Sequence, residues 1–348
     1  MGSNAEERKR RILALIVQTY IEQTTPVSSQ TISERLGMEV SPATVRNVMG
    51  ELEVEELIAQ PHTSAGRVPT DLGYRYYVDS LMEVPTLLPA EIERIETLFV
   101  SSYHAMSVLV ERAARVLATL SQQVAVGLAP ALRQEALKRF EVIPLEQGKL
   151  LGVVRTTDGF VHSHVVELQE ELQGEELAGL LRFINAEFAG VELGGIETLL
   201  THRLLAAQDA FFYLVRRAQQ LLQHAVAEIA EERLHYEGLG NLFIQPEFRE
   251  DVEQTRALVQ TFEEPALLLR LLDVPLADSG LRVTIGREHA TTALAGCSVV
   301  SASYGCGGHV LGRIGIIGPT RMPYPRVAAL VGYMGQQMSD YLTHALRE

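Results

Sequence analysis

The feature that most constrains this chain is a pair of short helices joined by a tight turn, predicted between residues 28 and 57. Ser28 begins the first helix, and Gly37 stands where the residue after a helix commonly adopts a left-handed backbone conformation. The second helix begins at Ser41, because a serine hydroxyl accepts hydrogen bonds from backbone N–H groups and the following Pro42 fits the first helical position. Two helices in this arrangement are typical of a helix-turn-helix.

The flanking segments complete a small domain. Residues 6–23 carry apolar side chains at helical spacing, which predicts a helix ahead of the pair. Residues 57–59 can extend as a strand, and residues 60–69 have the length and the glycine and proline content of a β-hairpin. Thr70 then begins another helix, whose tyrosines we expect to pack between domains. The sequence therefore predicts a winged helix over residues 1–84.

A winged helix can bind DNA by placing the second helix of the pair in the major groove and the hairpin beside it. Arginine is suited to guanine there, and asparagine to adenine. The side chains that we predict to contact DNA are Ser28, Gln30, Ser41, Ala43, Thr44, Arg46, Asn47, His62, Thr63, Ser64 and Arg67. Cations at the start of a helix oppose its macrodipole, which favours a phosphate partner. We predict such phosphate contacts for Arg8, Lys9 and Arg11.

The net charge alone does not indicate this partner. The chain carries 30 basic and 44 acidic residues, for a net charge of −14, whereas DNA affinity comes from neutralising phosphates. Residues 1–80 hold 8 of the basic and 11 of the acidic residues, so this part is less acidic than the remainder without being basic. The motifs, rather than the charge, carry the DNA-binding interpretation.

The remainder of the chain alternates between helical and strand patterns. After a proline-containing linker, we predict a long helix from residue 90 to about 126 and a further helical stretch from 170 to 235. A closing helix is predicted over 325–346. The predicted strands cover 140–145, 150–155, 160–168, 281–285, 297–304 and 309–317. Two groups of strands separated by helices suggest one α+β domain interrupted by an insertion.

Signatures of other functions are missing from the sequence. No phosphate-binding loop and no nucleophile or zinc motif occurs, so we expect no enzyme activity, cofactor or metal. The glycines at 305–308 lie between two predicted strands, which indicates a hairpin turn. Two cysteines in 348 residues cannot form a disulfide framework, and no apolar run is long enough for a membrane span. We therefore expect a cytoplasmic protein without membrane contact.

Two blocks of sequence match a known pattern. The first comprises SPATVRNVM at residues 41–49, PHTSAGRVPT at 61–70 and GYRYYVD at 73–79. The second comprises IGRE at 285–288 and GIIGPTRMPY at 315–324. Together the blocks resemble the heat-inducible transcription repressor HrcA family, in the right order and over nearly the whole chain.

This resemblance implies both a fold and a function. The fold is α+β, with a winged helix at residues 1–84, a GAF-like domain at 85–169 and 273–348, and a mainly helical dimerisation domain inserted at 170–272. The function is negative regulation of class I heat-shock operons, which encode chaperones, by a dimer bound to the inverted-repeat operator CIRCE. The family also implies that a chaperonin partner maintains the repressor and that its activity is lost on heating.

Other interpretations remain open from the sequence. The apolar stripe at 204–234 fits either a dimer contact or a plain core helix. Its dimer-interface candidates are Leu204, Phe211, Leu214, Leu221 and Val226. Because GAF-like folds often hold small ligands, the main alternative function is a winged-helix regulator gated by a metabolite. An enzyme built on the α+β domain is a third interpretation, but no motif supports it.

Overall fold

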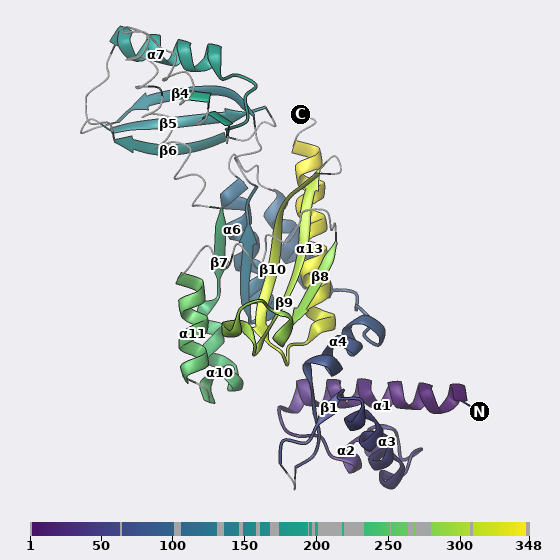
Figure 1. Ribbon diagram of the computed structural model, residues 1–348. Coiled ribbons are helices and arrows are strands. Elements are labelled where there is room, and N and C mark those ends of the chain that lie inside the picture. Colours follow the sequence, from purple (N-terminus) through teal and green to yellow (C-terminus); the bar gives the residue numbers. More distant parts are fainter. Residues whose placement is uncertain are drawn as a thin grey trace.

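The structure is a computed structural model that describes residues 2–62, 65–100, 106–130, 136–145, 149–157, 161–167, 174–193, 195–196, 199–200, 218, 233–250, 252–263, 268, 280–306 and 309–345. It contains an N-terminal helical domain, a five-stranded sheet flanked by helices, and a separate three-stranded sheet with one helix against it (Figure 1). We call the five-stranded sheet and its helices the body. The predicted mixture of helix and sheet is confirmed.

The N-terminal domain is the predicted winged helix. Its elements are α1 (Gly2–Gln23), α2 (Ser29–Arg35), α3 (Pro42–Val54), β1 (Ile58–Ala59), β2 (Val68–Pro69) and α4 (Asp71–Ser80). The three predicted helix starts are confirmed, since the hydroxyls of Ser28, Ser41 and Thr70 each accept a hydrogen bond from a backbone N–H of the first turn. Gly37 has a φ of +64°, as predicted for the residue that follows α2.

The hairpin after α3 forms a small wing. Ile58 pairs with Pro69 and Ala59 with Val68, in antiparallel register. The segment before α2 joins them, because Val27 and Arg67 exchange both backbone hydrogen bonds, at 2.8 and 2.9 Å. This third contact ties the wing to the start of the helix pair.

The body sheet has the strand order β7-β3-β10-β9-β8. These strands are β3 (Val124–Leu128), β7 (Leu234–Glu237), β8 (Leu281–Ile285), β9 (Cys297–Cys306) and β10 (His309–Pro319). One face packs against α6 (Met106–Ser121) and α13 (Tyr324–Ala345), and the other meets η4 (Leu239–Ile244), α10 (Pro246–Glu250) and α11 (Val252–Glu263) (Figure 1). β9 and β10 pair up to His309 and Cys306, so the predicted hairpin at this glycine-rich turn is confirmed.

Two helix predictions need correction at their ends. The predicted helix over 90–126 is divided into α5 (Pro89–Glu96), the 3₁₀ turn η1 (Thr97–Val100) and α6, and its last residues belong to strand β3. All five residues of β3 are buried, so their apolar run shows no alternation that could distinguish a strand from a helix. The helix predicted to continue through residue 235 is likewise wrong at its end, because β7 pairs there with β3.

Three strands between residues 137 and 167 form a second sheet apart from the body sheet. Strands β4 (Leu137–Pro144), β5 (Lys149–Thr156) and β6 (Val161–Glu167) pair only with one another among the described residues, although they were expected within the first part of the GAF-like domain. They share a core with α7 (Gly174–Glu187), in which Phe140 and Ile184 are buried. Strand β7, in contrast, lies within the range predicted for the inserted domain, residues 170–272, but it pairs with β3 in the body sheet. Hairpin turns are visible in a sequence, whereas the sheet that a hairpin joins depends on tertiary packing.

The winged helix and the body share one hydrophobic core. Buried side chains from α1, α4, α6 and α13 form a single cluster, which includes Ile16, Tyr77, Leu117 and Leu330. Within the part of the chain that the structure describes, no helix is long and apolar enough to cross a membrane.

Candidate nucleic-acid interface

Helix α3 presents one face to the core and the opposite face to solvent. Its buried side includes Val45, Val48 and Leu52, which pack within the winged helix. Arg46 and Asn47 are exposed, and neither forms a hydrogen bond or ion pair with any described residue. Because an arginine and an asparagine without intramolecular partners can donate to base edges, we call α3 the reading helix.

The start of the reading helix is fixed by its cap. The Ser41 hydroxyl accepts a hydrogen bond from the Thr44 N–H at 3.2 Å and lies 2.9 Å from the Thr44 hydroxyl. Ala43 is exposed beside them. Ser41 and Thr44 therefore have a structural role, and they lie next to the exposed face that holds Arg46 and Asn47.

Two further DNA candidates in α2 also have partners within the protein. The Ser28 hydroxyl accepts a hydrogen bond from the Thr31 N–H at 3.1 Å, and the Gln30 amide donates to Glu34 at 2.8 Å. Both side chains are exposed. Both side chains therefore lie at the surface. Ser28 caps the start of α2, and the Gln30–Glu34 hydrogen bond runs along the same helix.

The wing residues divide into an exposed histidine and an arginine with a partner. His62 is exposed at the wing, and Thr63 and Ser64 lie outside the described residues. Arg67 donates to the Glu53 carboxylate through Nε at 3.0 Å and through a terminal nitrogen at 2.8 Å, and its side chain is only 22% exposed. Arg67 therefore connects the wing to the reading helix, and its predicted contact with DNA stays a prediction.

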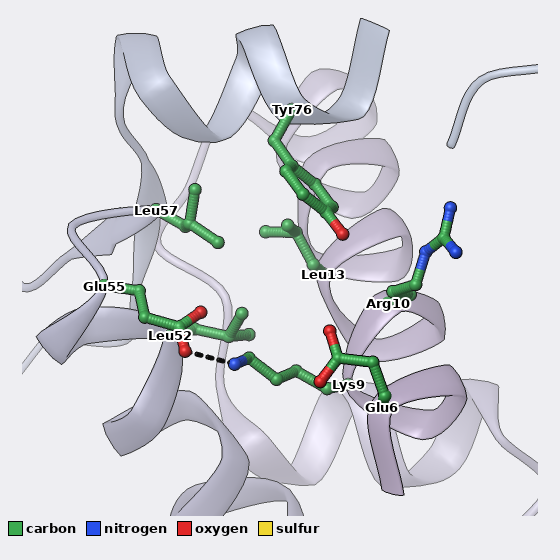
Figure 2. Close-up of a pocket in the computed structure, with 8 residues that line it drawn as sticks. All are labelled: Glu6, Lys9, Arg10, Leu13, Leu52, Glu55, Leu57 and Tyr76. Carbon is green, nitrogen blue, oxygen red and sulfur yellow. Dashed lines mark hydrogen bonds and ion pairs between the residues drawn. The ribbon is translucent and has the colours of Figure 1, made fainter. Parts of the chain in front are cut away.

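The three basic residues of α1 that were predicted to bind phosphate differ in their exposure and in their ion-pair partners. Lys9 is 15% exposed and forms an ion pair with Glu55, which raises the pKa of Lys9 through their hydrogen bond (Figure 2). Lys9 therefore already has a carboxylate partner, and its predicted phosphate contact stays a prediction. Arg11 lies 3.6 Å from Glu39 in a solvent-exposed pair. Arg8 is exposed and has no ion pair with a described residue.

A pocket of about 200 Å³ surrounds the Lys9–Glu55 pair, between α1, α3 and α4 (Figure 2). Acidic and basic groups both line it, and Arg10 at its edge donates to the Ser80 carbonyl at 3.1 Å. Glu53 and Glu55, which bind Arg67 and Lys9, were missed as functional residues. Nothing in the local sequence marks them, because each partner is at least 14 residues away along the chain.

Comparison with known proteins identifies the family. The N-terminal segment 5–80 matches the winged helix-turn-helix transcription repressor, HrcA DNA-binding family, and residues 107–328 match the HrcA protein C-terminal domain family. The heat-inducible transcription repressor HrcA of Desulfitobacterium hafniense is 35% identical over 340 residues, which cover 97% of this chain and 98% of that protein. The chain belongs to the HrcA family.

Further relatives agree with this membership. The heat-inducible transcription repressor HrcA of Desulforudis audaxviator is 35% identical, over 98% of this chain and 99% of that protein. A crystal structure of a hypothetical protein aligns with a TM-score of 0.64 and 27% identity, over 97% of this chain and 98% of the other. HrcA proteins are transcription repressors, so the predicted family and its DNA-binding function are confirmed.

The predicted dimer contacts lie in another part of the HrcA chain. Leu204, Phe211, Leu214, Leu221 and Val226 all lie outside the described residues. Leu234, at the end of the apolar stripe, lies in strand β7 and pairs with Leu128 of β3. The dimer interface therefore stays a prediction.

Proposed function

We propose that this chain represses class I heat-shock operons by binding, as a homodimer, to the inverted-repeat operator CIRCE. The observation that carries the proposal is the exposed face of the reading helix, where Arg46 and Asn47 have no partner among the described residues. A two-fold operator requires a two-fold protein, in which each protomer reads one half-site. The same proposal places the chain in the cytoplasm with its operator DNA.

Regulation by heat is the second part of this proposal. A repressor with a few kcal/mol of stability loses a large share of its folded population over a modest temperature rise. A chaperonin that refolds the repressor would then maintain the active population until other unfolded proteins occupy it. Heating purified protein and measuring its operator-binding capacity, with and without chaperonin, tests this part. Binding that survives heating unchanged, and that chaperonin does not alter, would contradict it.

The operator test compares a labelled CIRCE duplex with a scrambled duplex of the same length, at several stated salt concentrations. We expect Arg46→Ala and Asn47→Ala each to weaken CIRCE binding by about 1–3 kcal/mol, because each removes a bidentate base contact. Affinity for the scrambled duplex should change little, since the phosphate contacts remain. Arg94→Ala is the matched control, because Arg94 is an exposed arginine of α5 in the body.

Either of two results would contradict the proposed reading helix. In one, the wild-type chain shows no preference for CIRCE, even in the presence of chaperonin. In the other, Arg46→Ala lowers the affinity for CIRCE and for the scrambled duplex by the same factor, and Arg94→Ala does so to the same extent. Arg46 would then supply only general positive charge. Mass measurement of the complex by light scattering distinguishes two protomers per operator from one.

A further inference from the structure

The winged helix is held against the body by a defined set of polar contacts. On the body side they come from strand β8 and the turn after it, and from the turn between β10 and α13 together with the first residue of α13. We call their contact residues the docking surface: Val283, Gly286, Arg287, Glu288, Arg321 and Tyr324. The winged-helix side is α4 together with the end of α1 (Figure 1).

The first of these contacts joins Arg75 of α4 to Glu288. Nε of Arg75 donates to one carboxylate oxygen at 2.8 Å, and a terminal nitrogen donates to the other. That nitrogen also donates to the Val283 carbonyl at 2.7 Å, and the second terminal nitrogen donates to Asp79 at 3.1 Å. A two-pronged arginine–carboxylate pair fixes direction as well as distance. Arg75 therefore constrains the angle of α4 on the body.

A second contact, close to the first, joins the first turn of α4 to the turn after β8. The Asp71 carboxylate accepts a hydrogen bond from the Arg287 backbone N–H at 3.0 Å. Gly286, with a φ of +51°, lies so close that a Cβ built on it would come within 2.3 Å of the Asp71 carboxylate. The turn requires glycine both for its backbone conformation and for this approach.

A third contact lies at the other turn. Arg321 donates to the Ile21 carbonyl at the end of α1 at 2.8 Å, while an ion pair with Glu247 holds its guanidinium in place. The Tyr324 ring packs against Tyr74 of α4, with centroids 5.7 Å apart. The two contacts bind different helices of the winged helix, so together they restrict its rotation.

Two contacts join α4 to the segment that follows the reading helix. The Thr70 hydroxyl at the start of α4 donates to the Glu56 carbonyl just after α3, at 2.6 Å. A Cβ on Gly73 would come within 1.9 Å of the Leu57 carbonyl, so α4 and the segment after α3 are in direct contact. Orienting α4 on the body therefore orients the reading helix.

We propose that Arg75, Glu288 and Gly286 are positioning residues that set the separation and phase of the two reading helices in the dimer. This inference rests on the proposed function, in which two protomers bind one inverted repeat. A half-site is recognised by the reading helix alone, whereas the spacing between half-sites is recognised through the docking surface. Loosening the docking surface then relaxes the spacing requirement without changing half-site recognition.

The experiment uses the full-length chain with three duplexes: the CIRCE operator, the same operator with about two base pairs added between its half-sites, and a single half-site. Two added base pairs rotate one half-site by about 70° relative to the other. The variants are Arg75→Glu, Glu288→Arg, the double exchange of both, and Gly286→Ala. Arg287→Ala is the matched control, because its backbone N–H remains and its side chain has no partner among the described residues. Thermal melting by circular dichroism confirms that each variant is folded.

We expect the wild-type chain and Arg287→Ala to bind the lengthened operator at least about tenfold more weakly than the natural one, which is about 1.4 kcal/mol. The ratio of affinity for the natural operator to affinity for the lengthened one should fall to about twofold or less in Arg75→Glu, Glu288→Arg and Gly286→Ala. Their affinity for the single half-site should not change. The double exchange should raise the ratio above that of either single exchange, since it re-forms the ion pair, but not fully to the wild-type value, because a glutamate at position 75 cannot donate to the Val283 carbonyl or to Asp79.

Two outcomes would overturn the inference. In one, the single variants retain the wild-type ratio of affinities for the natural and the lengthened operator; in the other, they lose half-site binding together with full-operator binding while remaining folded. Failure of the proposed function looks different, because the wild-type chain would then show no preference for the inverted repeat.

Discussion

Ion pairs within the winged helix determine which of its basic side chains are available to DNA. Lys9 and Arg67 are bound by Glu55 and Glu53, and both have little exposed surface. Arg46 has no such partner among the described residues. An arginine that already has a carboxylate partner brings no net positive charge to a phosphate. A count of cations along the sequence therefore overstates the DNA-facing charge.

Arg67 provides a test at this scale. Arg67→Ala should weaken operator binding, because the wing loses its connection to the reading helix, but the salt dependence should change little. Arg8→Ala should reduce the slope of log affinity against log salt by about 0.9, as expected when one phosphate contact is lost, because Arg8 is exposed and has no ion pair with a described residue. Titrations of both variants at several salt concentrations measure the two slopes. Equal reductions in slope would show that Arg67 also binds a phosphate.

Helix starts were the elements that the sequence indicated best. Ser28, Ser41 and Thr70 act through hydrogen bonds to residues three positions later, so the information needed to predict them is local. Strand β3 was missed for the opposite reason, and for the same reason the sequence predicted strands β4, β5 and β6 without showing whether they join the body sheet. A strand buried on both faces has no polar alternation, and the partner of a hairpin is decided by contacts between distant segments.

The cap of the reading helix can be tested directly. Ser41→Ala removes the hydrogen bond to the Thr44 N–H and should cost the winged helix about 1 kcal/mol, within a usual range of about 0.5–2 kcal/mol. Ser41→Asn should retain most of the stability, because asparagine also caps helices well. Urea unfolding followed by circular dichroism is the suitable measurement, as the chain has no tryptophan. If the urea midpoint of Ser41→Ala equals that of the wild type, the Ser41 cap does not stabilise the start of α3.

The candidate site was predictable to a similar, limited extent. Arg46 and Asn47 lie on the exposed face, as the helical period indicated. The functions of Glu53 and Glu288 could not be anticipated, since Glu288 meets Arg75 across 213 residues of chain. The two motif blocks meet in the structure, because Arg75 of the first contacts Glu288 of the second where the winged helix meets the body.

At the scale of the whole molecule, two groups where the winged helix meets the body have shifted pKa values. His289 follows Glu288, and burial lowers its pKa below the ordinary value of 6.5, although the neighbouring charges of Glu288 and Asp71 act in the opposite direction. Burial of Glu288 favours its protonated form, but the hydrogen bonds from Arg75 and from the Ile285 N–H outweigh this and lower its pKa. The two groups act in separate pH ranges.

The pH dependence of stability follows from these directions. The unfolded chain takes up a proton on His289 near pH 6.5, whereas the folded chain does so only at lower pH, so the free energy of unfolding should fall as pH drops from about 7 to 5. The Glu288 contribution should be lost only below about pH 4.5. His289→Gln should flatten the first decline, and His62→Gln, at an exposed position, is the control. Thermal melting across this pH range measures both, and an unchanged decline in His289→Gln would contradict the assignment.

The edge of the body sheet shows how the chain accommodates its second sheet. The chain leaves β3 at Ala129 and returns to β7 at Arg233, and these two residues are hydrogen-bonded to each other, N–H to carbonyl at 2.7 Å. Leu128 and Leu234 are the next paired positions. The chain between residues 129 and 233 thus leaves the body sheet and rejoins it at the same place, as the loop of a hairpin does. The body needs only that its two ends meet, so sequence and length between them are free to diverge without altering the sheet that carries the DNA-binding domain.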